Sequence, residues 1–122
     1  MANEIALTAA LSITKSGVTI SGAVTGKAIT QSGDQSIGNI QIIGTSSEAI
    51  TIGDVVTIGY IYFKNLDATN FVSIHDVSPA VAGAASITLK AGECAVIPTR
   101  TTAWYAIADT ADVNLHVVAI EL

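Results

Sequence analysis

Charged residues are scarce in this sequence: Asp, Glu, Lys and Arg make up 12% of its 122 residues, about half the usual share. The five basic residues are scattered among ten acidic ones, which gives a net charge of −5. Without a basic patch to neutralise phosphates, we expect neither direct nucleic-acid binding nor attraction to an anionic membrane. Few charges also make a surface cheap to bury against a partner. We therefore expect a subunit of an obligate assembly, with a soluble β-domain of neutral surface as the alternative.

Cysteine is nearly absent, because Cys94 is the one thiol in the chain. A single cysteine excludes a disulfide framework and a cysteine-based zinc site within one chain. Cys94 lies in the apolar run ECAVIP, where we expect it to be a small buried residue.

A signal sequence is also missing from the N-terminal segment MANEIALTAALSIT. Glu4 stands where a signal peptide carries a basic residue, and the apolar residues alternate with polar ones. We therefore expect neither a signal peptide nor a membrane span.

Helical periodicity is lacking throughout, and β-branched residues dominate instead. Apolar residues alternate along residues 5–13, and the segment 18–25 pairs back across the turn KSG as a hairpin. Gly22 and Gly26 are candidate bulge positions. The further predicted strands lie within 37–44, 48–54, 58–66, 70–77, 87–98 (two strands), 104–109 and 113–122.

About ten short strands predict an all-β fold, namely a two-sheet antiparallel sandwich of jelly-roll-like type. We expect one domain over residues 1–122, with residues 1–14 as a candidate N-terminal arm or exchanged strand. Both faces of the last strand are apolar near its end, through Val117 on one face and Val118 and Ile120 on the other. That strand is therefore either central and covered on both sides, or it meets another subunit.

Catalytic groups are sparse. His75 and Asp76 are adjacent, and neighbours on a strand point to opposite faces, so we expect no dyad. His116 lies 41 residues further on, and the closely spaced histidines of a cupin-like metal site are missing. We expect no enzyme activity, no metal and no cofactor, with both histidines as ordinary strand residues near an edge or interface.

Only six aromatic residues are present, and four lie within YIYFKNLDATNFVSIHD. Tyr60 and Tyr62 share one face of a strand and Phe63 takes the other, while of the adjacent Trp104 and Tyr105 one points inward. Outward rings could stack on sugars, as in a lectin, or anchor a protein interface. We favour the interface, with Phe63 and Tyr105 in the core.

Three segments, YIYFKNLDATNFVSI, LKAGECAVIP and WYAIADTADVNLHVVAIEL, resemble a group of short virion proteins of tailed bacteriophages. The shared pattern falls on Gly59–Ile74, Leu89–Glu93 and Tyr105–Ala111, and IGTSSEAITIGDV (43–55) also fits. The resemblance covers the C-terminal two thirds of the chain, whereas the first 35 residues fit only loosely.

The resemblance implies a non-enzymatic structural protein of the particle, and within that class a head decoration, or cement, protein. Such a protein would be assembled in the host cytoplasm, lie on the capsid exterior, bind the major capsid protein and staple neighbouring subunits together. It would be a homo-oligomer, expected to be a trimer. A tail, fibre or connector component, with carbohydrate binding through surface aromatics, is the alternative. The interface candidates are Ile5, Leu7, Leu11, Tyr60, Tyr62, Trp104, Val118, Ile120 and Leu122.

Overall fold

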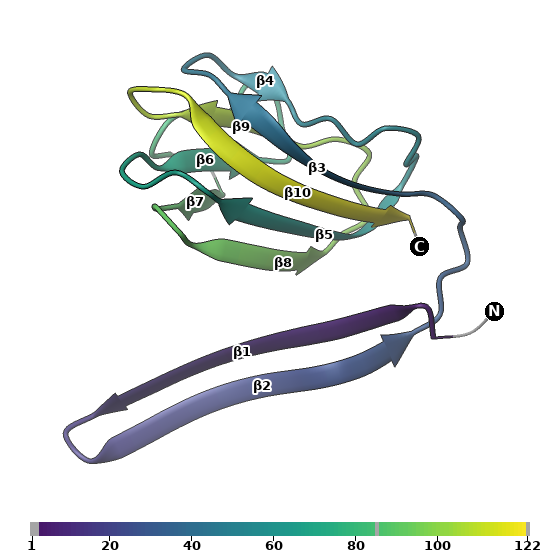
Figure 1. Cartoon of the computed structure of the whole chain (residues 1–122), viewed down its shortest axis with the longest axis vertical. Coiled ribbons are helices and arrows are strands. Elements are labelled where there is room, and N and C mark those ends of the chain that lie inside the picture. The colour runs from purple at the N-terminus through teal and green to yellow at the C-terminus, as the bar shows by residue number, and fades with distance from the viewer. Residues whose placement is uncertain (1–2, 85, 122) are drawn as a thin grey trace. The chain divides into compact units, whose positions relative to one another are not determined.

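The computed structural model describes residues 3–84 and 86–121, which contain ten strands and no helix (Figure 1). The all-β prediction is confirmed, and each strand overlaps a predicted segment, although the first two strands run on to Lys15 and Ile29, beyond the predicted 5–13 and 18–25. In chain order they are β1 (Ile5–Lys15), β2 (Val18–Ile29), β3 (Ser36–Ile43), β4 (Glu48–Ala49), β5 (Ile58–Asn65), β6 (Val72–His75), β7 (Ile87–Leu89), β8 (Cys94–Pro98), β9 (Tyr105–Ala108) and β10 (Val113–Glu121).

The chain divides into two compact units, residues 1–33 and residues 34–122. The first unit is a hairpin of β1 and β2, which form a two-stranded sheet of their own and are called the arm below. Our sequence prediction had one sandwich over 1–122 with 1–14 as a candidate arm. The structure instead gives both of the first two strands to a separate unit.

The arm is closed by a two-residue turn and contains one irregularity. Ser16 and Gly17 both have positive φ, 53° and 80°, between the paired residues Lys15 and Val18. Two such residues fit the right-handed twist of a hairpin. The pairing shifts between Leu7 and Ala9, opposite Gly26, whose φ is 58°. The Gly26 N–H donates to the Thr8 side-chain oxygen at 2.9 Å, so Gly26 lies at the bulge that the sequence predicted.

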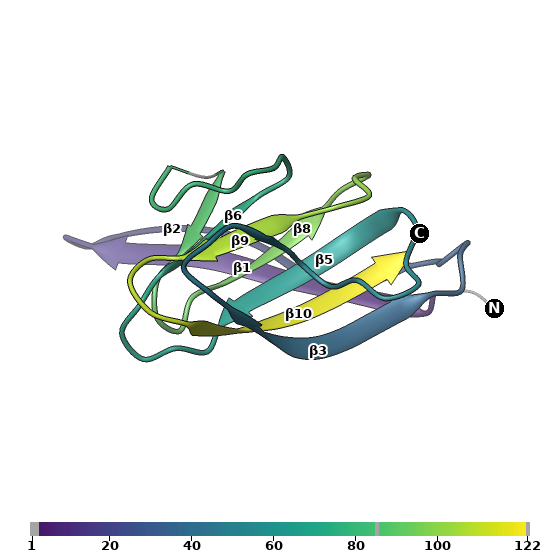
Figure 2. The same ribbon diagram turned by 90° about the horizontal axis from the view of Figure 1, so that it is seen from above.

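The second unit is a sandwich of two four-stranded antiparallel sheets. The first, called the β10 sheet, has the order β3-β10-β5-β8, and the second, called the β9 sheet, has the order β4-β9-β6-β7. From β3 to β10, successive strands pass from one sheet to the other, except at the β6–β7 hairpin. Figure 2 shows β3, β10 and β5 side by side. Eight strands in two sheets is the strand count of a jelly roll, which remains our interpretation of this order.

The core lies between these two sheets. Alternate residues of β10 point into it, and Val113, Leu115, Val117 and Ala119 are fully buried. β10 is central in its sheet, between β3 and β5, and Val118 and Ile120 on its other face are half-buried at the outer side of the sheet. Each large buried side chain contributes on the order of 2 kcal/mol to folding.

Phe63 and Trp104 form the aromatic centre of this core. Their ring centroids are 5.7 Å apart and the ring planes meet at 70°, an edge-to-face contact. Trp104 is 5% exposed, whereas its neighbour Tyr105 is half-buried. The sequence had placed Tyr105 in the core and Trp104 among the outward candidates, so the structure reverses that pair. Trp104 precedes β9 but is buried in phase with Ala106 and Ala108, so the error lay in which of the two alternating faces was taken as the inner one.

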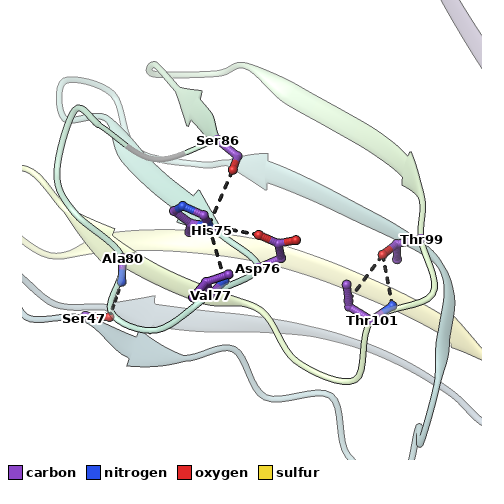
Figure 3. A network of polar contacts seen from close by, with 8 residues as sticks. All are labelled: Ser47, His75, Asp76, Val77, Ala80, Ser86, Thr99 and Thr101. Carbon is purple, nitrogen blue, oxygen red and sulfur yellow. Dashed lines mark hydrogen bonds and ion pairs between the residues drawn. The ribbon is translucent and has the colours of Figure 1, made fainter.

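The outer side of the β9 sheet is partly covered by the chain itself. Ser73 of β6 is fully buried, and its hydroxyl accepts the Gly83 N–H at 2.9 Å. Further along the same loop, the Ala80 N–H donates to the Ser47 hydroxyl at 2.8 Å (Figure 3). These bonds fix the loop after β6 against its own sheet.

Candidate interaction surfaces

The arm has one apolar face and one small, polar face. Ile13 stands directly opposite Ile20, and Ala9 opposite Val24, on the apolar face. On the other face Ser12 pairs with Ser21, and the hydroxyls of Thr14 and Thr19 are 2.9 Å apart. This pattern follows from the period of two in the sequence, because side chains at i and i+2 share a face.

The apolar face of the arm is exposed. Leu11 is 84% exposed, Ile20 67% and Ile13 57%, and Val18 and Val24 are also exposed. A two-stranded hairpin alone is only marginally stable in water, because it lacks a layer against which to bury such residues. The arm therefore has a row of apolar side chains that a single chain leaves exposed to water.

A hollow lies at the middle of this apolar face. Leu11 pairs with Gly22, whose missing side chain leaves open space beside the leucine. Ile13 and Ile20 also line the hollow, together with Ser12 and Ser21. Leu11 projects beside the gap at Gly22, and a complementary apolar surface can fill that gap.

The outer face of the β10 sheet is the second exposed apolar surface. Ile40 and Ile42 of β3 are 61% and 62% exposed, and Val96 of β8 is also exposed. Between them lie half-buried residues of β10 and β5 that point the same way. The register places on this outer face Ile40, Ile42, Asn114, His116, Val118, Ile120, Tyr60, Tyr62, Lys64, Cys94, Val96 and Pro98.

One aromatic contact organises the middle of this outer face. The rings of Tyr62 and His116 meet edge to face, with centroids 5.4 Å apart and planes at 80°. Lys64 is the one charged side chain in the set just given, because the acidic residues of the sandwich lie mainly in turns. The outer face is thus largely uncharged, as interface cores are.

The structure spreads the predicted interface residues over three environments. Tyr60, Tyr62, Val118 and Ile120 are half-buried on the outer face of the β10 sheet. On the arm, Ile5 is buried, Leu7 half-buried and Leu11 exposed, while Trp104 lies in the core and Leu122 is outside the described residues.

Sequence reasoning missed Ile13 and Ile20 on the arm and Ile40 and Ile42 on the sandwich. The sequence contained the information, because each of these residues lies two positions from another apolar residue on the same face of its strand.

The three rings of the carbohydrate-binding alternative, Tyr60, Tyr62 and Trp104, do not lie on one surface. Trp104 packs against Phe63 between the sheets, whereas Tyr60 and Tyr62 point outward from β5. The two tyrosines are left without the third ring on their face.

His75 and Asp76 contact each other, contrary to our prediction. The His75 Nδ1 atom lies 3.0 Å from an Asp76 carboxylate oxygen (Figure 3). Asp76 follows the last residue of β6, so the strand alternation that should separate the two side chains has already ended. The Ser86 hydroxyl is 3.5 Å from the same nitrogen.

This group does not have the arrangement of a catalytic triad. A triad needs the carboxylate on one ring nitrogen and the nucleophile on the other. Here Asp76, Ser86 and the Val77 N–H (3.3 Å) all approach His75 Nδ1. His116 lies in the other sheet, on β10. Within residues 3–84 and 86–121, no three His, Cys, Asp or Glu side chains come together as a metal site.

Cys94 is exposed at the start of β8, where the sequence had predicted a buried residue. It pairs with Lys64 and so points to the outer face of an edge strand. The apolar run around it misled the prediction, because alternate residues of that run, Ala95 and Ile97, are the ones packed against the core.

Comparison of the chain with protein-family models, with curated proteins and with solved structures finds no match. In the part of the chain that is described, no helix has the length and hydrophobicity to cross a membrane.

Proposed function

We propose that this protein is a non-enzymatic structural component of a virus particle, a decoration protein that binds the major capsid protein on the outside of a bacteriophage head. The observation that carries the proposal is the pair of exposed apolar surfaces, one on the arm and one on the β10 sheet. Together they give one small chain two separate apolar surfaces for contacts with other subunits, as a component of an assembly requires.

The resemblance of the segment from Gly59 to Ile74 to tailed-phage virion proteins supplies the setting. Two polar residues of this segment have a structural use here, since Asn65 and Asp67 shape the turn after β5. A rigid sandwich held by such a turn suits a protein whose task is to keep its surfaces in fixed geometry. We extend the proposal to a homotrimer on the capsid exterior, as the resemblance implies.

The proposed mechanism couples binding of this protein to the stability of the assembled shell. A protein that binds the assembled shell and not the free capsid subunit stabilises the shell by mass action. Several weak contacts from one oligomer add through avidity, so no single contact has to be strong.

The test uses heads of the parent phage purified without this protein. Addition of the purified chain should saturate regular surface positions, seen by electron cryomicroscopy, and should raise the temperature at which the heads release DNA. An absence of binding to heads, together with binding to purified tails, would replace the decoration role by the tail, fibre or connector role. Binding to neither would overturn the proposal.

A further inference from the structure

We propose that the apolar face of the arm docks on the outer face of the β10 sheet of a second copy of this chain. Both surfaces are exposed within one chain, with Leu11 and Ile20 on the arm and Ile40 and Ile42 on the sandwich. Because both belong to the same sequence, every donor arm has one acceptor face in a closed ring of copies. The inference deepens the proposed function by naming the contact that forms the oligomer.

The net charges of the two units favour contact between the arm of one copy and the sandwich of another. The arm unit, residues 1–33, carries Lys15 and Lys27 against Glu4, a net charge of +1. The remaining residues hold three basic and nine acidic side chains, a net charge of −6. At long range an arm is therefore attracted to a sandwich and two sandwiches repel each other, while on the acceptor face itself the one charge is that of Lys64.

Area favours the same arrangement. The arm strands are 11 and 12 residues long. At roughly 3.3 Å per residue and about 10 Å across two strands, the apolar face covers about 350 Å². A copy that gives its arm and also receives one covers two such areas, about 700 Å² of its surface in all, although each single contact of about 350 Å² is smaller than the roughly 800 Å² per partner of a standard interface. Arm-to-arm contact would use only half as much.

The shapes of the two surfaces also suit each other. The acceptor is a four-stranded sheet, and two β-layers pack face to face at about 10 Å through interdigitating side chains. The hollow at Gly22 beside Leu11 is a gap into which an aromatic or branched side chain of the acceptor can insert. Tyr60 and Tyr62 are the large side chains that the acceptor face offers.

The test starts from two matched double variants of the full chain. Ile13→Asp with Ile20→Asp places two charges opposite each other on the apolar face, and Ser12→Asp with Ser21→Asp places the same two charges on the other face. We expect the wild type and the serine variant to be oligomers by light scattering and sedimentation. The isoleucine variant should dissociate at concentrations roughly 100-fold higher, because its charges would be buried without partners.

A second pair of variants tests the acceptor face. Ile40→Asp with Ile42→Asp should also give monomers, whereas Val56→Asp with Val77→Asp, at exposed valines outside both surfaces, should not. The emission of Trp104, which is buried in the sandwich, reports that the sandwich of each variant is folded, and the β-signal in far-ultraviolet circular dichroism, compared with that of the matched serine variant, reports on the arm. Mixing the arm variant with the face variant should restore one contact and yield a heterodimer, because one chain keeps its arm and the other keeps its face.

Three outcomes would overturn this inference. A wild type that stays monomeric shows that the arm does not dock on another copy. A face variant that keeps the oligomer while the arm variant loses it shows that the arms contact one another. An oligomer that both double variants leave intact shows that other surfaces hold it. None of these results depends on capsids, so failure here is distinct from failure of the decoration role.

Discussion

The side chain of Asn65, fully buried at the end of β5, donates a hydrogen bond of 2.9 Å to the backbone carbonyl of Leu89 in β7. The same amide nitrogen donates to the Asn70 carbonyl at 2.8 Å, and its oxygen accepts the Asp67 N–H at 2.9 Å. One side chain thus joins the turn after β5, in one sheet, to β7 in the other. A polar group without such partners would be costly to bury.

We predict that Asn65→Ala lowers the free energy of unfolding by roughly 2–4 kcal/mol, because it removes one buried and two partly buried hydrogen bonds. Urea titration monitored by Trp104 emission measures the change. Asn65→Leu separates hydrogen bonding from volume and should be as damaging as alanine. Asn114→Ala, at an exposed position of β10, should change stability by less than about 0.5 kcal/mol. Recovery of stability in the leucine variant would show that packing, and not hydrogen bonding, is what Asn65 supplies.

Asp67 should make part of the stability depend on pH. The backbone N–H of Asn70, and then that of Thr69, donate to its carboxylate and lower the pKa of Asp67 below the usual value. Because the folded pKa lies below the unfolded one, the stabilisation is complete above the unfolded pKa and disappears as the pH falls through the folded pKa.

The variant Asp67→Asn should therefore be less stable than the wild type at neutral pH, and the difference should shrink on acidification below the ordinary pKa of aspartate, about 3.9. Urea titrations at a series of pH values measure it. Asp54→Asn removes one charge from another exposed loop and is the control. A difference between Asp67→Asn and the wild type that does not vary with pH would contradict the assigned role.

Much of the fold followed from alternation alone. Residues such as Leu115 and Val117 repeat at intervals of two, and that period fixes which face of β10 enters the core once the strand is recognised. The ten strands were recoverable because Gly, Ser and Asp mark the turns between them. The separation of the arm was not recoverable, because alternation shows that a strand has an apolar face and not what covers it.

The errors in the site lie where strands end or reach an edge. Asp76 could meet His75 because β6 stops between them. Cys94 opens an edge strand, where one face of an apolar run remains exposed. Trp104, just before β9, is buried in phase with Ala106 and Ala108, and the sequence did not show which of the two alternating faces turns inward. The direction of these side chains depends on where a strand ends, which strands lie beside it and which of its faces turns inward, and a single sequence specifies these details least well.

The buried position of Trp104 predicts its spectroscopy. It is the one tryptophan in the chain, and its ring packs against Phe63. The folded protein should show blue-shifted emission that moves to the red on unfolding. Trp104→Ala should cost about 3–5 kcal/mol, because it opens a cavity in the core. Tyr105→Ala, at the half-buried neighbour, should cost less than half as much. Red-shifted emission from the folded protein, quenched readily by iodide, would return Trp104 to the surface.

The exposed thiol of Cys94 gives a last prediction. In the monomeric variant Ile13→Asp with Ile20→Asp, where no arm covers the acceptor face, Ellman's reagent should titrate one thiol per folded chain without denaturant. Cys94→Ser should change the free energy of unfolding by less than about 0.5 kcal/mol, because the side chain adds little to the core. Leu89→Ala, at a buried position of the neighbouring strand in sequence, should cost roughly 2–5 kcal/mol in the same assay. A thiol that reacts only after urea is added would mean that Cys94 is buried, and would shift the alternation of β8 by one residue.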